Sequence, residues 1–246
     1  MKTLKEKVIL VTGASRGIGA AIAQELARAG ATVIVNYAGN ASAAAATVAA
    51  IQAGGGEAFA IQADVSRSEE VSRLFTEAIT RYGRIDVLVN NAGIMITKTL
   101  KDTTDEEFSR QFDINVRGTF NTMREAATRL ADKGSVINFS SSTTRMMMPA
   151  YGTYVATKGA VEQMTRVFAK EVGSRGINVN CVSPGPTNTE LFTDGKPDEL
   201  IARLAGLSAF NRIGEPEDIA RVITFLAGDD AKWVSGQNIG VNGAMA

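Results

Sequence analysis

The sequence predicts an α/β protein whose single, doubly wound parallel sheet of about seven strands carries helices on both faces. Short β-branched, apolar runs recur along the chain, longer helix-length segments separate them, and each run ends in or is followed by glycine, asparagine, aspartate or serine. Such continuous apolar strands are typical of a sheet covered on both faces, and their helical spacers indicate βαβ units. Because repeats and breaks in composition are missing, we expect one domain over residues 1–246.

The expected strands occur in order along the chain. They are KVILVT (7–12), ATVIVN (31–36), EAFAIQA (57–63), IDVLVN (85–90), SVINFS (135–140) and INVNCV (177–182). The alanine-rich stretch that ends at Gly54, Gly55 and Gly56 is predicted to be a helix and turn rather than a linker. Alanine is the best helix former, and glycine commonly ends a helix.

Composition and charge exclude several classes of function. Basic and acidic residues balance at 26 each, so no net field favours nucleic acid or an anionic membrane surface. The chain has no histidine and one cysteine, Cys181, so we expect neither a metal centre nor a Ser/His/Asp mechanism. No apolar run approaches the roughly 20 residues that span a bilayer, and we expect a soluble, cytoplasmic protein.

A glycine-rich loop, TGASRGIG (12–19), follows the first expected strand, and a helix through Gly30 follows the loop. Gly13 can make the tight turn, and Gly17 and Gly19 let the backbone approach a pyrophosphate bound by free helix amides. The spacing G-x-x-x-G-x-G differs from the common G-x-G-x-x-G fingerprint. A glycine-rich turn without a ligand is therefore the alternative.

The second expected strand ends at Asn36 and Tyr37, where a fold that uses NAD places a carboxylate for the ribose diol. A neutral amide tolerates a 2′-phosphate that a carboxylate would repel, and Arg16 in the glycine loop can supply a cation. The alternative for Arg16 is a solvated loop charge. We predict NADPH over NADH, although no lysine or arginine directly follows Tyr37.

Two further strand ends carry small or polar residues. Asp64 and Val65 follow the third strand, where the aspartate either accepts from an adenine amino group or caps a helix starting near Ser66. The sequence NNAG (90–93) follows the fourth strand, and an ordinary turn would explain it equally well. Together, these strand ends indicate a ligand crevice at the carboxyl edge of the sheet.

The stretch AYGTYVATKGA (150–160) holds two tyrosines and a lysine. Tyr154 and Lys158 stand four apart in an expected helix, so they share one face. Tyr151 lies roughly 10 Å from Lys158 along the helix axis. Spacing therefore favours Tyr154 as the reactive phenol. Its ordinary pKa near 10 must fall before it can act as a base, and we expect the Lys158 ammonium to lower it. The alternative is an amphipathic helix with a solvated lysine.

Taken together, these motifs resemble the classical short-chain dehydrogenase/reductase family over nearly the whole chain. The matching motifs are TGASRGIG (12–19), NNAG (90–93), a serine before YVATK (154–158) and SPG (183–185). The resemblance implies a Rossmann-type fold, and the C-terminal GQNIGVNGAMA resembles the last strand and tail of the family. It also implies a homotetramer.

The resemblance also implies a catalytic set of Asn115, Ser141, Tyr154 and Lys158. Tyr154 would act as acid or base, Ser141 would orient the carbonyl, and Lys158 would bind the ribose. Asn115 would hold a water molecule in a proton relay. Ser141 is selected from a triple serine because the family serine lies thirteen residues before its tyrosine, and Ser140 is the alternative.

The cofactor site implied by these motifs spans several loops. The expected contacts are Gly13, Ser15, Arg16, Gly17, Ile18, Gly19, Asn36, Tyr37, Asp64, Val65, Asn91, Ala92, Gly93, Tyr154, Lys158, Pro184, Gly185, Thr187 and Thr189. Residues 190–212 resemble the mobile substrate loop of the family. Met146, Met147 and Met148, completed by Leu191, Phe192 and Phe210, form an expected apolar pocket or, as the alternative, fill the core.

The subgroup of closest appearance is the 3-oxoacyl-carrier-protein reductases. Those enzymes dock an acidic carrier protein through basic residues near the active site. Arg175 fits this role, but Asp132 occupies a position where a basic residue is expected. We therefore predict an NADPH-dependent reductase of a 3-oxoacyl thioester (on an acyl carrier or CoA) or of a free ketone or keto ester. An alcohol, sugar or steroid dehydrogenase acting oxidatively is one alternative. A non-catalytic cofactor-sensing protein is another.

Overall fold

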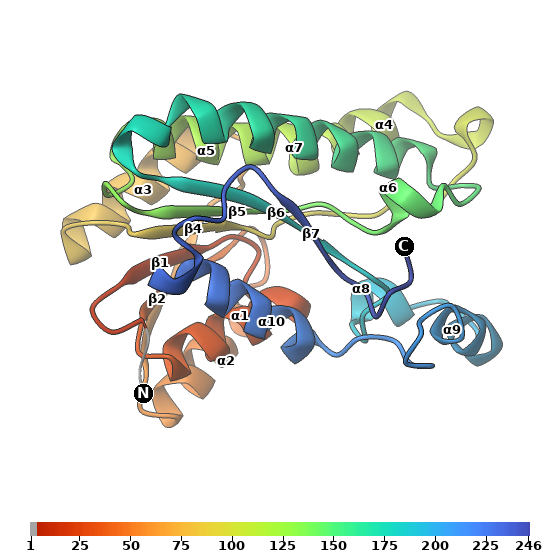
Figure 1. Ribbon diagram of the computed structural model, residues 1–246, viewed down its shortest axis with the longest axis horizontal. Helices are drawn as coiled ribbons and strands as arrows, with labels where there is room; N and C mark the ends of the chain where they lie inside the picture. The colour runs from red at the N-terminus through yellow and green to blue at the C-terminus, as the bar shows by residue number, and fades with distance from the viewer. Residues whose placement is uncertain (1–3) are drawn as a thin grey trace.

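A computed structural model describes residues 4–246 and shows a sheet sandwiched between two layers of helices (Figure 1). Within these residues the sheet has seven parallel strands in the order β3-β2-β1-β4-β5-β6-β7. The strands are β1 (Val8–Val11), β2 (Thr32–Tyr37), β3 (Glu57–Gln62), β4 (Val87–Asn90), β5 (Ser135–Phe139), β6 (Asn178–Pro184) and β7 (Asn238–Val241). The predicted fold class is confirmed.

The longer helices divide between the two faces of the sheet (Figure 1). One face carries α3 (Ser68–Tyr82), α4 (Asp105–Phe112), α5 (Gly118–Arg129) and α7 (Gly152–Glu171). The other carries α1 (Gly17–Arg28), α2 (Ala41–Ala53) and α10 (Pro216–Ala227). Shorter helices are α6 (Thr143–Met146), α8 (Glu190–Thr193), α9 (Asp198–Ala205) and the 3-10 turns η1 (Leu100–Asp102), η3 (Gly173–Arg175) and η4 (Asp229–Ala231). Among residues 4–246, none of the helices is both long and apolar enough to cross a membrane.

Each face of the sheet has its own apolar core, and β1 contributes to both. Ile9 and Val11 pack in the core that contains Ile22 of α1, whereas Leu10 packs in the core that contains Phe75 of α3. Successive side chains of a strand point to opposite faces, so a strand that is apolar throughout must be covered on both. This burial holds the carboxyl ends of the strands in fixed register.

The end of α1 and the start of α3 differ by two residues from the expected helix boundaries. The helix expected to run through Gly30 ends at Arg28, and Gly30 has a φ of 102° that a helix cannot continue. The helix expected near Ser66 begins at Ser68 with Arg67 as its N-cap. Asp64 therefore does not cap it, and that alternative is wrong.

A buried polar network ties β4 and β5 to the helices above them. Asn90 and Asn138 are register partners, and the Asn90 amide donates to Asn138 Oδ1 at 2.8 Å. The Asn138 amide donates to Thr165 Oγ1 of α7 at 2.9 Å, and the Thr122 hydroxyl of α5 donates to Asn90 Oδ1 at 2.7 Å. All four side chains are buried, so each lost bond leaves a polar group without water.

We expect Thr165→Val to destabilise the protein by about 1–3 kcal/mol, because the isosteric methyl cannot accept from the buried Asn138 amide. Thr128→Val on the exposed side of α5 is the matched control, with an expected change within about 0.5 kcal/mol. Urea unfolding at constant m value measures both. Equal midpoints for the two variants would show that the network contributes nothing to stability.

Candidate active site

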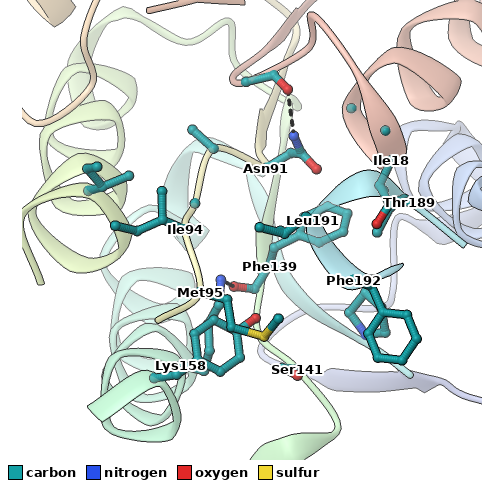
Figure 2. A pocket seen from close by; sticks show the side chains of 18 of the residues that line it. Ile18, Asn91, Ile94, Met95, Phe139, Ser141, Lys158, Thr189, Leu191 and Phe192 are labelled. Atoms are coloured by element: carbon teal, nitrogen blue, oxygen red, sulfur yellow. Dashed lines mark hydrogen bonds between the residues drawn. The ribbon is translucent and has the colours of Figure 1, made fainter. Parts of the chain in front are cut away.

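A cavity of about 1010 Å³ lies where the strands of the sheet end (Figure 2). Every cofactor and catalytic residue predicted from the sequence lines it, except Asn115. The lining residues from that set are Gly13, Ser15, Arg16, Gly17, Ile18, Gly19, Asn36, Tyr37, Asp64, Val65, Asn91, Ala92, Gly93, Ser141, Tyr154, Lys158, Pro184, Gly185, Thr187 and Thr189. Segments that are far apart in sequence therefore meet in one place.

The cavity begins where the strand order reverses, between β1 and β4. Gly13 has a φ of +61°, and a Cβ there would lie 2.8 Å from the Cα of Ala92, so the turns after β1 and β4 touch. The Asn91 amide donates to the carbonyl oxygens of Thr12 and Gly13 at 3.0 Å each, and Figure 2 shows Asn91 reaching toward this loop. The two turns form one rigid floor.

Helix α1 points its first turn at this floor. It begins at Gly17, and the preceding Arg16, as N-cap, makes no side-chain capping bond to the described chain. The first backbone amides of a helix have no partner within it and carry the positive end of its dipole. Gly17 lines the cavity, so this turn can bind an anionic group such as a pyrophosphate.

Asn36, expected to leave room for a 2′-phosphate at the end of β2, instead bonds through its side chain to neighbouring backbone groups. Asn36 is buried, and its amide donates to the carbonyls of Ile61 and Ala63 at 3.3 and 3.0 Å. Its oxygen accepts from the amide of Gly13 at 3.4 Å. Asn36 thus ties three strand ends together, and an aspartate here would set a carboxylate against two carbonyl oxygens. A variant at this position would disturb the fold as well as the choice of cofactor.

The residues after Tyr37 also line the cavity and were missed by the sequence analysis. They are Ala38, Gly39 and Asn40. Asn40 caps α2 by accepting from the amide of Ala43 at 2.9 Å. An asparagine directly before an alanine-rich helix is a recognisable N-cap signal, so this second helix start was detectable in the sequence. No acidic residue occurs between Tyr37 and Asn40.

Arg16 and Asp64 are both engaged with neighbours at the cavity wall. The guanidinium of Arg16 pairs with the carboxylate of Glu190 at 3.0 Å, and both side chains are more than two-thirds exposed. Such an exposed pair contributes little energy and can exchange for a stronger anionic partner. Asp64 accepts from the backbone amide and hydroxyl of Ser66 at 2.9 and 2.7 Å, which fixes the turn after β3.

Asn115 lies behind the cavity and holds its wall. It sits in a five-residue π-helical segment, η2 (Asp113–Arg117), that joins α4 to α5. Its oxygen accepts from the Ile94 amide at 2.8 Å, and its amide donates to the Ile94 carbonyl at 2.9 Å and to Thr157 Oγ1 at 3.1 Å. The helix is irregular at Asn115, as a helix that contributes to a functional site often is.

The three consecutive serines have different partners. The Ser140 hydroxyl donates to the Glu162 carboxylate at 2.6 Å, and the Ser142 hydroxyl donates to the Ser183 carbonyl at 3.2 Å. Ser141 Oγ instead accepts from the Thr143 hydroxyl at 2.9 Å, close enough to Tyr154 to influence its pKa. Ser141 is therefore the serine whose hydroxyl lies beside the phenol, rather than the alternative Ser140.

Tyr154 and Lys158 lie on one face of α7. The Lys158 ammonium is 5.5 Å from the centre of the Tyr154 ring and donates to the Phe139 carbonyl at 3.1 Å. Burial raises the pKa of Tyr154 to about 12, while the Ser141 hydroxyl acts in the opposite direction. Burial lowers the pKa of Lys158 to about 8, against the effect of Cys181. Burial is thus the largest influence on the pKa of Tyr154 in this structure, and it acts in the direction opposite to the lowering expected from Lys158.

Tyr151 forms part of the wall rather than a second reactive group beside the lysine. Its ring lies 6.4 Å from that of Tyr154 in an edge-to-face arrangement, and it is buried. Burial raises the pKa of Tyr151, and a side-chain hydrogen bond with Thr97 opposes this. Tyr151 therefore supports Tyr154 from one side and contacts the segment after β4 on the other.

Besides the charged residues Glu106, Arg110 and Asp113, the cavity has an apolar wall. It is lined by Ile94, Met95, Met146, Met148, Tyr151, Leu191, Phe192 and Leu204, several of which Figure 2 shows around Ser141 and Lys158. Met147 is outside it: this residue is 79% exposed and has a φ of 49°. Phe210 is also outside and 70% exposed, so these two expected pocket residues are corrected.

The segment expected to cover the substrate forms the far wall. It contains α8 and α9, which lie together beyond the end of the sheet (Figure 1). A bridge between Thr187 and Gly214 joins the two ends of this segment, and Gly214 donates to the Pro186 carbonyl at 2.8 Å. Leu191, Phe192 and Leu204 reach the cavity from these helices.

Arg175 is on the wrong side of the molecule for carrier docking near the cavity. It ends η3, just before β6 begins, so it lies at the amino end of a strand whose carboxyl end reaches the cavity. Its guanidinium pairs with Asp132 at 2.7 Å and donates to the carbonyls of Ala127 and Leu130. The suggestion that Arg175 fits a carrier site beside the active site is wrong.

Comparison with known proteins agrees with this geometry. A family model described as Enoyl-(Acyl carrier protein) reductase matches residues 13–245. Versicolorin reductase 1 of Aspergillus parasiticus is 44% identical over 98% of this chain and 96% of its own. The NADPH-dependent aldehyde reductase-like protein of Arabidopsis thaliana chloroplasts is 42% identical over 98% and 94%.

Solved structures give the same result. The angucycline C-6 ketoreductase LanV, with bound NADP, is 40% identical, covers 99% of this chain and 96% of its own, and superposes with a TM-score of 0.93. The family match, from residue 13 to residue 245, covers strands β2 to β7, the glycine loop from Gly13 and the tyrosine helix α7. The chain therefore belongs to the short-chain dehydrogenase/reductase family of NAD(P)-dependent oxidoreductases.

Proposed function

We propose that this protein is an NADPH-dependent reductase that converts a free ketone on a bulky apolar framework to the alcohol. The observation that carries the proposal is the position of Tyr154, which lines the cavity together with Ser141 and has the Lys158 ammonium 5.5 Å from its ring centre. An ordinary tyrosine is protonated at neutral pH, and burial raises the pKa of Tyr154 further. A protonated phenol beside the Ser141 hydroxyl can donate to a carbonyl oxygen, which is the proton step that ketone reduction requires.

The cofactor part of the proposal rests on three features of the inner cavity. The uncapped start of α1 suits a pyrophosphate, and the tight glycine turn leaves room for it. The loop after β2 lacks a carboxylate, and Arg16 lies at the cavity wall, where a 2′-phosphate can replace Glu190 as its partner. The relative LanV was solved with bound NADP, and an Arabidopsis relative is named NADPH-dependent.

The reaction then assigns one task to each polar group. When bound, the reduced nicotinamide supplies the hydride. Tyr154 donates its proton to the carbonyl oxygen, and Ser141 donates a hydrogen bond to the same oxygen and orients it. Lys158, charged below its pKa of about 8, stabilises the phenolate left on Tyr154. Asn115 fixes the backbone on both sides of the pocket through Ile94 and Thr157.

The substrate class follows from the outer cavity. Its methionine, isoleucine, leucine and phenylalanine side chains suit a large apolar body, and methionine adapts to varied shapes. Arg175 is committed to Asp132 at the far edge of the sheet, which removes the sequence argument for an acidic carrier protein. Two relatives are named for reduction of versicolorin and of the angucycline C-6 ketone.

Oxidation of an alcohol is the second candidate, because the same groups serve the reverse reaction. In that direction Tyr154 would accept the proton that it donates in ketone reduction. The physiological ratio of oxidised to reduced cofactor would then decide the direction. A cofactor-sensing protein without turnover would not need the serine, tyrosine and lysine together in one cavity.

We expect Tyr154→Phe to lower the kcat for ketone reduction by about 100-fold to 10,000-fold, because the general acid is removed. The dissociation constant for NADPH, measured by fluorescence titration, should stay the same. Tyr151→Phe is the comparison variant; it removes a phenol hydroxyl that lies beside Thr97, so the fall in kcat should stay below about tenfold. Unchanged turnover in Tyr154→Phe would remove the phenol from the mechanism.

We expect Arg16→Ala to raise the KM for NADPH by about 10-fold to 100-fold, the loss of one charged contact, with a much smaller change for NADH. Initial rates at 340 nm with each cofactor measure this. Arg166→Ala, on the exposed side of α7 and outside the cavity, controls for the loss of one positive charge. An equal rise for both cofactors would show that Arg16 does not read the 2′-phosphate.

A substrate panel with NADPH tests the substrate class. We expect the highest kcat/KM for fused-ring aromatic ketones, lower values for small ketones, and the lowest for acetoacetyl-CoA, since the pocket wall is apolar. An enoyl thioester belongs in the panel because the matching family model is described as an enoyl reductase. Preference for either thioester would contradict the proposed substrate class.

A further inference from the structure

We propose that Gln111, a residue outside the cavity, positions Met95 in the substrate pocket and thereby sets the preference for bulky ketones. This inference rests on the function proposed above. Gln111 lies in the last turn of α4, is fully buried, and does not line the cavity. Met95 does line it, and Figure 2 shows its side chain directed into the pocket from the segment after β4.

Two amide side chains hold the segment that carries Met95. The oxygen of Asn115 accepts from the Ile94 amide at 2.8 Å, and the oxygen of Gln111 accepts from the Ile96 amide at 2.6 Å. Gln111 and Asn115 are four residues apart where α4 runs into η2, so they offer two acceptors along one side of the helix. The backbone on both sides of Met95 is thereby held in place against the helix.

Thr97, the residue after Ile96, links this segment to the tyrosines at the start of α7. Thr97 lies close enough to Tyr151 to lower the pKa of its phenol, and the ring of Tyr151 lies edge-on to Tyr154. The segment from Ile94 to Thr97 therefore runs between the helix amides and the tyrosine pair. A shift of this segment would move Met95 relative to the reacting phenol.

Stability alone does not explain a glutamine at this place. The Gln111 Nε2 atom is buried and, among the described residues, is the one buried side-chain nitrogen or oxygen without a hydrogen-bond partner. A buried polar group without a partner destabilises the folded state, which offsets the bond that Oε1 makes to Ile96. Leucine of similar size would remove the partnerless Nε2 atom but would also leave the Ile96 amide without its acceptor, so the two effects on stability oppose each other.

The test compares Gln111→Leu with Gln111→Glu, whose buried, protonated carboxyl keeps an acceptor for the Ile96 amide. We expect Gln111→Leu to raise the KM for a fused-ring ketone by about tenfold, with little change for a small ketone or in NADPH affinity. Gln111→Glu should restore the wild-type KM. Equal rises for bulky and small ketones, or no rise for either, would overturn the proposal.

A double-mutant cycle with Met95→Ala separates positioning from a general structural effect. In the wild-type background Met95→Ala should raise the KM for the bulky ketone, whereas in the Gln111→Leu background it should add less than about twofold. Additive effects in the two backgrounds would show that Gln111 does not act through Met95, and would overturn the inference.

Hydrogen exchange gives a readout that does not depend on turnover. We expect the amides of residues 94–97 to exchange about tenfold faster in Gln111→Leu and at the wild-type rate in Gln111→Glu, with other peptides unchanged. Unchanged exchange in Gln111→Leu would contradict the proposed clamp. If the wild-type protein reduced no ketone while the exchange result held, the proposed function would fail and the positioning of Met95 would stand.

Discussion

The close contact between the turns after β1 and β4 is the constraint on which the site depends. The strand order reverses there, so the two connecting segments leave the sheet in opposite directions and open a crevice. Gly13 touches Ala92 where a side chain would not fit, and Asn91 bonds to the carbonyls on the other side. The start of α1, the pocket wall after β4 and the tyrosine helix are all placed relative to this contact.

Amide and hydroxyl side chains take the structural and chemical tasks that histidine performs in many enzymes. Asn115 donates to Thr157, and Thr157 donates to the backbone carbonyl of Tyr154 at 2.7 Å, so the π-helical segment is linked to Tyr154. Asn138 joins β5 to α7 in a similar way. Because these amides and hydroxyls do not ionise, the pKa of the Tyr154 phenol is raised by burial and by Tyr151 and lowered by the Ser141 hydroxyl.

Much of the fold and of the site could be predicted because the signals are local. Strand ends, the glycine loop and the Tyr154–Lys158 spacing follow from neighbouring residues and regular geometry. Side-chain direction could not be predicted: Asn36 turns into the sheet edge, Met147 has a positive φ that points it to solvent, and Arg175 pairs at the opposite end of β6. The pKa of Tyr154 also depends on burial, which spacing along a helix does not reveal.

The most direct test of the central claim is to follow the hydride itself. NADPH deuterated at the nicotinamide C4, on each face in turn, would be incubated with the protein and a fused-ring ketone, and the product examined by mass spectrometry and NMR. The account predicts that one of the two labelled cofactors places a single deuterium on the new carbinol carbon, because the cavity brings cofactor and carbonyl together beside Tyr154. An alcohol without label from either cofactor, or a label on a neighbouring carbon, would contradict direct reduction of the ketone.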